Sequence, residues 1–146
     1  MIASFHHPSW VFVDTGGYFA LTSSRDQNHA AAVAIMRALI AGRFRIYTSN
    51  FVLAELHALL LTRISRRTAF DTLTVIDASD MTIVRVTRDD EARARQIIAR
   101  YDDKSLSLTD ATSFAIMDRL GIARAFTFDA NFSQYGLTVL TPASFR

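Results

Sequence analysis

The segment Trp10-Val11-Phe12-Val13-Asp14-Thr15-Gly16-Gly17 carries the pattern on which the fold prediction depends. Its apolar run has no polar interruption, which is typical of a strand that is buried on both faces of a parallel sheet. Asp14 and the two glycines then predict a turn directly after the strand. Because ligands bind at the carboxyl ends of parallel strands, Asp14 is the first candidate site residue.

The rest of the chain continues this alternation of strands and helices. Further strands are predicted over residues 44–47, 81–86, 123–128 and 137–140. Helices are predicted over residues 29–41, 51–61, 65–76, 89–101 and 107–120, with a short helix beginning within 18–21. Strands separated by helices of this length are typical of βαβ units. We therefore expect an α/β fold, a three-layer α/β/α sandwich with a mostly parallel central sheet.

Composition bounds the class of protein. A chain of 146 residues with 50% hydrophobic and 21% charged residues predicts one globular domain. We expect that domain over residues 10–146, preceded by a disordered N-terminal extension over residues 1–9 whose presence leaves the true translation start open. The chain has 0 cysteines, which excludes a disulfide framework, a thiolate zinc site and a cysteine nucleophile. No secretory signal or membrane-spanning run is present, so we expect a cytoplasmic protein.

The basic residues are almost all arginine, with Lys104 as the exception. Arginine suits phosphate binding through its planar fork, although genomic base composition explains the same bias more simply. Arg63, Arg66 and Arg67 form a small basic group that can contact phosphates, or else a solvated helix face. A formal net charge of +2 is too small to indicate a nucleic-acid partner by itself.

Four acidic residues are candidates for chemistry, beginning with two that follow predicted strands. Asp14 and Asp129 both come after apolar runs, although a turn-forming aspartate explains either one alone. Glu55 lies within an apolar helical segment, where a carboxylate is costly unless it is paired or bound to a metal. A narrow solvated stripe, or a pairing with a buried arginine, explains Glu55 equally well.

Asp110 opens a helix and is preceded by two hydroxyl residues, Ser107 and Thr109. The hydroxyls can orient a carboxylate, but they can equally be ordinary helix caps beside a favourable helix-dipole position. The four acids together say more than each alone, because clustered carboxylates repel unless a cation neutralises them. Oxygen ligands suit Mg²⁺ or Mn²⁺, and a metal-bound water is the nucleophile that phosphodiester hydrolysis requires.

Four segments of the chain, from about Val11 to the end, resemble the acidic motifs of PIN domains. They are residues 11–17, 48–56, 108–111 and 127–132. Their order and spacing most resemble the VapC toxins of VapBC type II toxin–antitoxin systems. The resemblance implies that Asp14, Glu55, Asp110 and Asp129 are the catalytic acids and hold one or two Mg²⁺ or Mn²⁺ ions. It also implies supporting hydroxyls at Thr15 and Thr109, and Asn131 departs from the histidine that many relatives carry.

The activity that this resemblance implies is an endoribonuclease, a hydrolase that is the toxin of a toxin–antitoxin pair. It also implies an RNA substrate, an antitoxin partner and a homodimer, with residues 51–61 and 69–76 as candidate contact surfaces. A tRNA, an rRNA loop and an mRNA remain open as targets. The alternative is a catalytically weak PIN-like module that binds protein or RNA. Dinucleotide, P-loop and serine-hydrolase sites are disfavoured, because their glycine-rich motifs are absent from the sequence.

Overall fold

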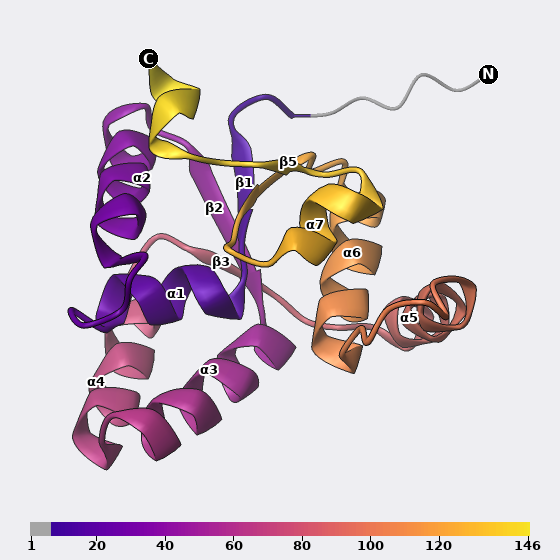
Figure 1. Ribbon diagram of the computed structural model, residues 1–146, viewed down its shortest axis with the longest axis horizontal. Coiled ribbons are helices and arrows are strands. Elements are labelled where there is room, and N and C mark those ends of the chain that lie inside the picture. Colours follow the sequence, from indigo (N-terminus) through magenta and orange to yellow (C-terminus); the bar gives the residue numbers. More distant parts are fainter. Residues whose placement is uncertain (1–6) are drawn as a thin grey trace.

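A computed structural model describes residues 7–146 and gives them a five-stranded sheet (Figure 1). The strands are β1 (Trp10–Val13), β2 (Arg45–Ser49), β3 (Thr82–Val84), β4 (Arg124–Phe126) and β5 (Thr138–Val139). Their order is β3-β2-β1-β4-β5, and each neighbouring pair is parallel. The predicted parallel sheet is therefore confirmed, with β1 at its centre.

Helices cover both sides of this sheet. They are α1 (Thr15–Thr22), α2 (His29–Ala41), α3 (Asn50–Arg63), α4 (Arg66–Asp77), α5 (Arg88–Arg100), α6 (Leu108–Leu120) and α7 (Ala130–Tyr135). Figure 1 shows α2 on one side of the sheet and α6 on the other, with α5 packed against α6. This arrangement confirms the three-layer α/β/α sandwich. Across residues 7–146, no helix combines the length and the apolar character that crossing a membrane requires.

The central strand is buried as its sequence predicts. Val11, Phe12 and Val13 have no exposed surface, and β1 bonds to β2 on one side and to β4 on the other. The turn after β1 requires glycine, because a Cβ at Gly17 would lie 2.7 Å from the carbonyl oxygen of Phe126. This close approach seats the first turn of α1 directly against β4.

The end of β4 differs from the prediction. The strand expected over residues 123–128 ends at Phe126, so Thr127 and Phe128 lie in the loop that follows. Asp129 then caps α7 by accepting a hydrogen bond at Oδ1 from the backbone N–H of Asn131, at 2.9 Å. The helix α7 was not predicted, and neither was the 3₁₀ helix η1 (Pro142–Phe145) at the end of the chain.

The expected extension over residues 1–9 lies mostly outside the described residues, which begin at His7. The His7 ring stacks on Trp10 with centroids 3.5 Å apart, and its backbone N–H donates to the carbonyl of Gly121 at 3.1 Å. The carbonyl of Ser9 accepts from the backbone N–H of Arg45 at 2.8 Å. Residues 7–9 thus contact the domain and lead directly into β1.

Candidate active site

The four predicted acids line a single cleft at the carboxyl end of the sheet, which we call the acid cleft. Asp14 follows β1, Glu55 comes from α3, Asp110 from the first turn of α6, and Asp129 from the N-cap of α7. The cleft has a volume of about 560 Å³, and Thr15 also lines it. Residues far apart in the sequence therefore meet where a parallel sheet is expected to bind its ligand.

Asp14 is the most enclosed of these acids, with an exposed fraction of 4%. Its backbone N–H donates to the carbonyl of Phe126 at 3.1 Å, and its Oδ2 accepts from the Thr127 hydroxyl at 2.9 Å. Its other oxygen, Oδ1, is buried and has no hydrogen-bond partner among residues 7–146, and the same holds for the Thr15 hydroxyl. Buried polar atoms without partners are rare, so these two mark a place where a ligand is expected.

Thr127 joins the first acid to the fourth, a role that the sequence analysis missed. Its side chain is fully buried, and its Oγ1 accepts from the backbone N–H of Asp129 at 3.1 Å while donating to Asp14. Because a hydroxyl has one proton, the bond from Asp129 leaves that proton for the Asp14 carboxylate. The available sequence signal was a threonine two positions before an acid that follows an apolar run.

Two of the acids have strongly shifted titration. Burial raises the pKa of Asp14 to about 7, and the negative charge of Asp110 adds to this, against the opposing hydrogen bond from Thr127. Burial also raises the pKa of Asp110 to about 6, reinforced by the charges of Asp129 and Glu55. Proximity of like charges and loss of water both favour the protonated acid, and a bound cation would relieve both.

Glu55 is half-buried and lies on the face of α3 that lines this cleft. None of the ion pairs in the described part of the chain involves Glu55, so the structure gives no support for a buried arginine partner. The helix begins as its sequence predicts, because the Ser49 hydroxyl accepts from the backbone N–H of Val52 at 3.1 Å. Next to Ser49, the Thr48 hydroxyl donates to the carbonyl of Val13 at 3.0 Å, which ties β2 to the strand that precedes Asp14.

Asp110 is held by the first turn of α6. The Ser107 hydroxyl caps that helix by accepting from the backbone N–H of Asp110 at 3.0 Å, as predicted for a cap. Thr109 contributes through its carbonyl oxygen, which accepts from the hydroxyls of Thr112 and Ser113 at 2.8 and 3.0 Å. The Thr109 hydroxyl itself makes no hydrogen bond within residues 7–146.

An ion pair between a buried aspartate and a partly exposed arginine fixes the other end of α6. Asp90 has an exposed fraction of 3% and accepts from both Nε and Nη2 of Arg119, each at 2.9 Å. The backbone N–H of Thr87 also donates to Asp90, and the Thr87 hydroxyl accepts in return. This bidentate pair joins α5 to α6 and so helps to place Asp110 in the acid cleft.

The donor set of the acid cleft fits a hard divalent cation. Carboxylate oxygens are the ligands that Mg²⁺ and Mn²⁺ prefer, and the unpartnered Oδ1 of Asp14 is available for such an ion. Over the described residues, no three His, Asp or Glu side chains are already gathered closely enough to coordinate a metal ion. The four acids therefore line one cleft without converging on one point, as mutually repelling carboxylates would.

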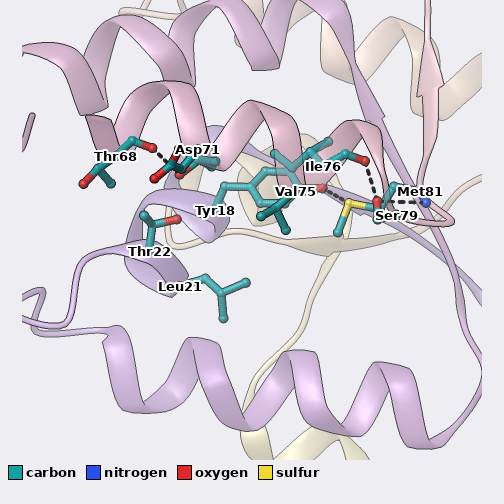
Figure 2. Close-up of a pocket in the computed structure, with 10 residues that line it drawn as sticks. Tyr18, Leu21, Thr22, Thr68, Asp71, Val75, Ile76, Ser79 and Met81 are labelled. Atoms are coloured by element: carbon teal, nitrogen blue, oxygen red, sulfur yellow. Dashed lines mark hydrogen bonds between the residues drawn. The ribbon is translucent and has the colours of Figure 1, made fainter. Parts of the chain in front are cut away.

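A second hollow lies between α1 and α4 and has a different character (Figure 2). Tyr18 and Leu21 line it from α1, and Val75 and Ile76 line it from α4. The Tyr18 hydroxyl donates to the sulfur of Met81, and burial raises the Tyr18 pKa above its usual range. This mostly apolar hollow contains none of the four acids, so it is distinct from the acid cleft.

Known proteins resemble this chain along most of its length. The family model for the PIN domain matches residues 11–137. The chain belongs to the PIN-domain family. This PIN domain is 34% identical to the 23S rRNA-specific endonuclease VapC20 of Mycobacterium tuberculosis over 132 residues, which are 90% of this chain and 98% of VapC20.

Three further comparisons concern the family and the fold. The PIN domain is 27% identical to a VapC ribonuclease of Archaeoglobus fulgidus, over 83% of this chain and 78% of that protein. The crystal structure of M. tuberculosis VapC20 superposes with a TM-score of 0.82, covering 90% of this chain and 99% of VapC20. VapBC2 of Rickettsia felis, at 13% identity, shares the fold with a TM-score of 0.67, over 90% of this chain and 97% of that one.

Proposed function

We propose that this PIN domain is a metal-dependent endoribonuclease and the toxin of a toxin–antitoxin pair. The observation that carries the proposal is the acid cleft, where Asp14, Glu55, Asp110 and Asp129 come together from four separate segments. The identity of 34% with an rRNA endonuclease, over 98% of that enzyme, supports the same activity. Carboxylates that hold a divalent cation are suited to phosphodiester hydrolysis.

In this proposal Asp14, Glu55 and Asp110 hold one or two Mg²⁺ or Mn²⁺ ions, and Asp129 completes the pocket. The metal supplies a water of lowered pKa and offsets charge on the scissile phosphate. The Thr127 hydroxyl holds Oδ2 of Asp14, while Oδ1 of that carboxylate has no partner among residues 7–146 and could bind the ion. The Thr15 hydroxyl, which is also buried without a partner in the described chain, could donate a hydrogen bond to an oxygen of the bound ligand.

The substrate we propose first is a loop of ribosomal RNA. Of the targets that the sequence leaves open, this one agrees with VapC20, which is named for 23S rRNA and described as cleaving the sarcin–ricin loop. A tRNA or an mRNA would leave different fragments. We propose the cytoplasm as its compartment, because ribosomes and other RNA are found there.

An antitoxin and a second copy of the chain are the protein partners we propose. The antitoxin follows from the likeness to VapC proteins and to the VapBC2 fold. Both candidate contact stretches keep exposed apolar side chains, with Leu61 45%, Phe70 65% and Val75 69% exposed, while Leu56 and Ile76 are buried in the core. The exposed members therefore provide apolar surface for a partner.

The alternative, a catalytically weak binding module, draws on one observation. No three acids in the described part of the chain are already grouped for metal binding, as an inactive site would also show. Against it, all four acids line the same cleft and Asp14 keeps an unpartnered buried oxygen. A metal ion that draws the carboxylates together distinguishes the two functions.

The deciding experiment is cleavage of total RNA by the wild type and by Asp110→Asn, with Mn²⁺ or Mg²⁺ and then with EDTA. We expect metal-dependent cleavage that disappears in the folded variant, with discrete fragments that identify the target. Equal cleavage by both proteins would mean a contaminating nuclease and a wrong site. A folded wild type without cleavage, freed of any antitoxin, would favour the binding module.

A further inference from the structure

A row of side chains leads out of the acid cleft along α3 and α1. Glu55 and Leu59 line the cleft, and Arg63 follows one turn later on the same face of α3, since residues four apart share a helix face. Arg63 lies eight residues after Glu55, which is about 12 Å along the helix axis. On α1, which packs against α3, Phe19 likewise lies one turn beyond Thr15. The two helices thus extend the wall of the cleft in one direction.

This row ends in a separate hollow, which we call the outer hollow. It has a volume of about 560 Å³, and its wall includes Phe19, Thr22, Arg25, Arg63 and Thr68. The Arg63 guanidinium lies 5.8 Å from the centre of the Phe19 ring, a cation–π contact that holds the cation at this wall. Figure 2 shows Thr22 of α1 and Thr68 of α4 at one end of the neighbouring apolar hollow, which they also line.

The charge of the outer hollow favours an anion. Arg25 and Arg63 are exposed, and neither belongs to the ion pairs found in residues 7–146. Asp26 also lines this hollow, but its Oδ1 already accepts from the backbone N–H of Asn28 at 2.8 Å. The wall of the outer hollow therefore carries two guanidinium groups and one carboxylate. The hydroxyls of Thr22 and the neighbouring serines add polar groups that suit a phosphate.

The acid cleft presents the opposite charge. Its wall contains four acids and no basic side chain, so a polyanionic strand is repelled everywhere except at a bound metal. Affinity for a nucleic acid comes chiefly from cations that contact its phosphates. Those cations must lie beside the cleft, and the outer hollow provides two of them at the end of a continuous helical wall.

We propose that the outer hollow is a subsite for a backbone phosphate of the RNA strand whose scissile phosphate lies in the acid cleft. This rests on the proposed ribonuclease function and adds the direction in which the strand leaves the cleft. Arg63 and Arg25 are the contacting residues, because a guanidinium binds a phosphate through two parallel N–H bonds. Such contacts fix the register of the strand and are independent of its base sequence.

The test compares Arg63→Gln and Arg25→Gln with Arg37→Gln, a matched exposed arginine on α2. All three changes are made in the Asp110→Asn chain, which prevents cleavage of the probe, a fluorescein-labelled single-stranded oligoribonucleotide. Binding is titrated at several salt concentrations. We expect each subsite variant to weaken binding and to reduce the slope of log affinity against log salt by about 0.7, the value for one lost single-strand phosphate contact. Arg37→Gln should keep the parent slope.

The outcomes separate this proposal from the proposed function. If Arg63→Gln and Arg25→Gln both keep the salt slope of the Asp110→Asn parent, the proposed subsite is wrong. Metal-dependent RNA cleavage by the chain with Asp110 intact would still support the ribonuclease function. A parent that neither binds the probe nor, with Asp110 restored, cleaves RNA would overturn both. In the cleaving chain, Arg63→Gln should raise KM more than it lowers kcat, and Arg63→Lys should recover part of the affinity because it keeps the charge.

Discussion

Asp14 and Asp90 are equally buried, with exposed fractions of 4% and 3%, yet their surroundings differ in one respect. Burial would raise the pKa of Asp90, but the hydrogen bonds from Arg119 and Thr87 outweigh it and lower that pKa below its usual value. Asp14 has one side-chain donor and one unpartnered oxygen, and its pKa rises to about 7. The chain thus supplies hydrogen-bond partners to both carboxylate oxygens of Asp90, which we call the closed acid. It leaves one carboxylate oxygen of Asp14 without a partner, and we call Asp14, which we assign to a ligand, the open acid.

The largest expected effect comes from changing the open acid. Asp14→Asn should lower metal-dependent RNA cleavage by about 10³-fold, because a bound metal supplies several kcal/mol of stabilisation to the transition state. Its thermal stability without metal should be equal to or higher than that of the wild type, since a buried charge is removed. Cleavage assays and thermal unfolding in EDTA measure the two effects. Loss of folding would instead assign Asp14 a structural role.

The closed acid should give the reverse pattern. Asp90→Asn weakens a bidentate ion pair and should lower the free energy of unfolding by about 2 kcal/mol, a value reduced because Arg119 is partly exposed. The variant should still cleave RNA at temperatures where it is folded. Urea unfolding gives the stability, and Asp89→Asn, an exposed neighbour on α5 that lies outside the ion pair, is its control. A stable but inactive Asp90→Asn would contradict the division between the two acids.

Changing Thr127 gives a smaller and more specific test of how Asp14 is held for metal binding. Thr127→Val removes the hydroxyl that holds Asp14 and keeps nearly the same volume, so we expect metal affinity to fall by about 10- to 100-fold. Thr127→Ser should recover most of it. The Mn²⁺ concentration that half-maximally raises the melting temperature reports this affinity without any cleavage. Unchanged affinity in Thr127→Val would show that Asp14 is positioned by other contacts.

The remaining expected effect is a dependence of stability on pH. In the folded chain the pKa values of Asp14 and Asp110 are about 7 and about 6, above the usual 3.8 that they have when unfolded. The folded state therefore holds more protons between pH 4 and pH 7, and the free energy of unfolding falls as the pH rises through this range. Melting temperatures in EDTA measure this decline, which should be smaller in Asp14→Asn. Asp90 acts with the opposite sign, because its stabilisation is lost only as the pH falls below about 4.

The sequence predicted those parts of the fold that depend on local pattern. The apolar run of β1, the helix over His29–Ala41 and the cap at Ser107 agree with the structure, because strand burial, helical periodicity and capping are written in neighbouring residues. The helix α7 escaped prediction because its six residues are too few to show a helical period. The end of β4 was placed too late, since Phe128 continues the apolar pattern after the strand has ended.

The sequence predicted which acids line the acid cleft, but it did not predict the contacts that hold them there. The positions of the four acids relative to strands and helix starts indicated one edge of the sheet, where they do lie. The hydrogen bond from Thr127 to Asp14 and the contact of Arg63 with Phe19 join segments distant in sequence, so no local pattern contains them. For Glu55 the sequence left burial, pairing and exposure open, and only the packing of α3 placed it at the cleft.

The strand order has a consequence for how this protein is made. β1 is the first strand of the described chain, but one of its neighbours is β4, and Asp129 enters the acid cleft only after β4 has paired. Contacts between segments so distant in sequence form late in folding. A chain still emerging from the ribosome therefore carries Asp14 and Glu55 without the partners that complete their site. An enzyme that attacks RNA would thus remain harmless to its own message and ribosome until the segment with β4 and Asp129 has been made and has paired with β1.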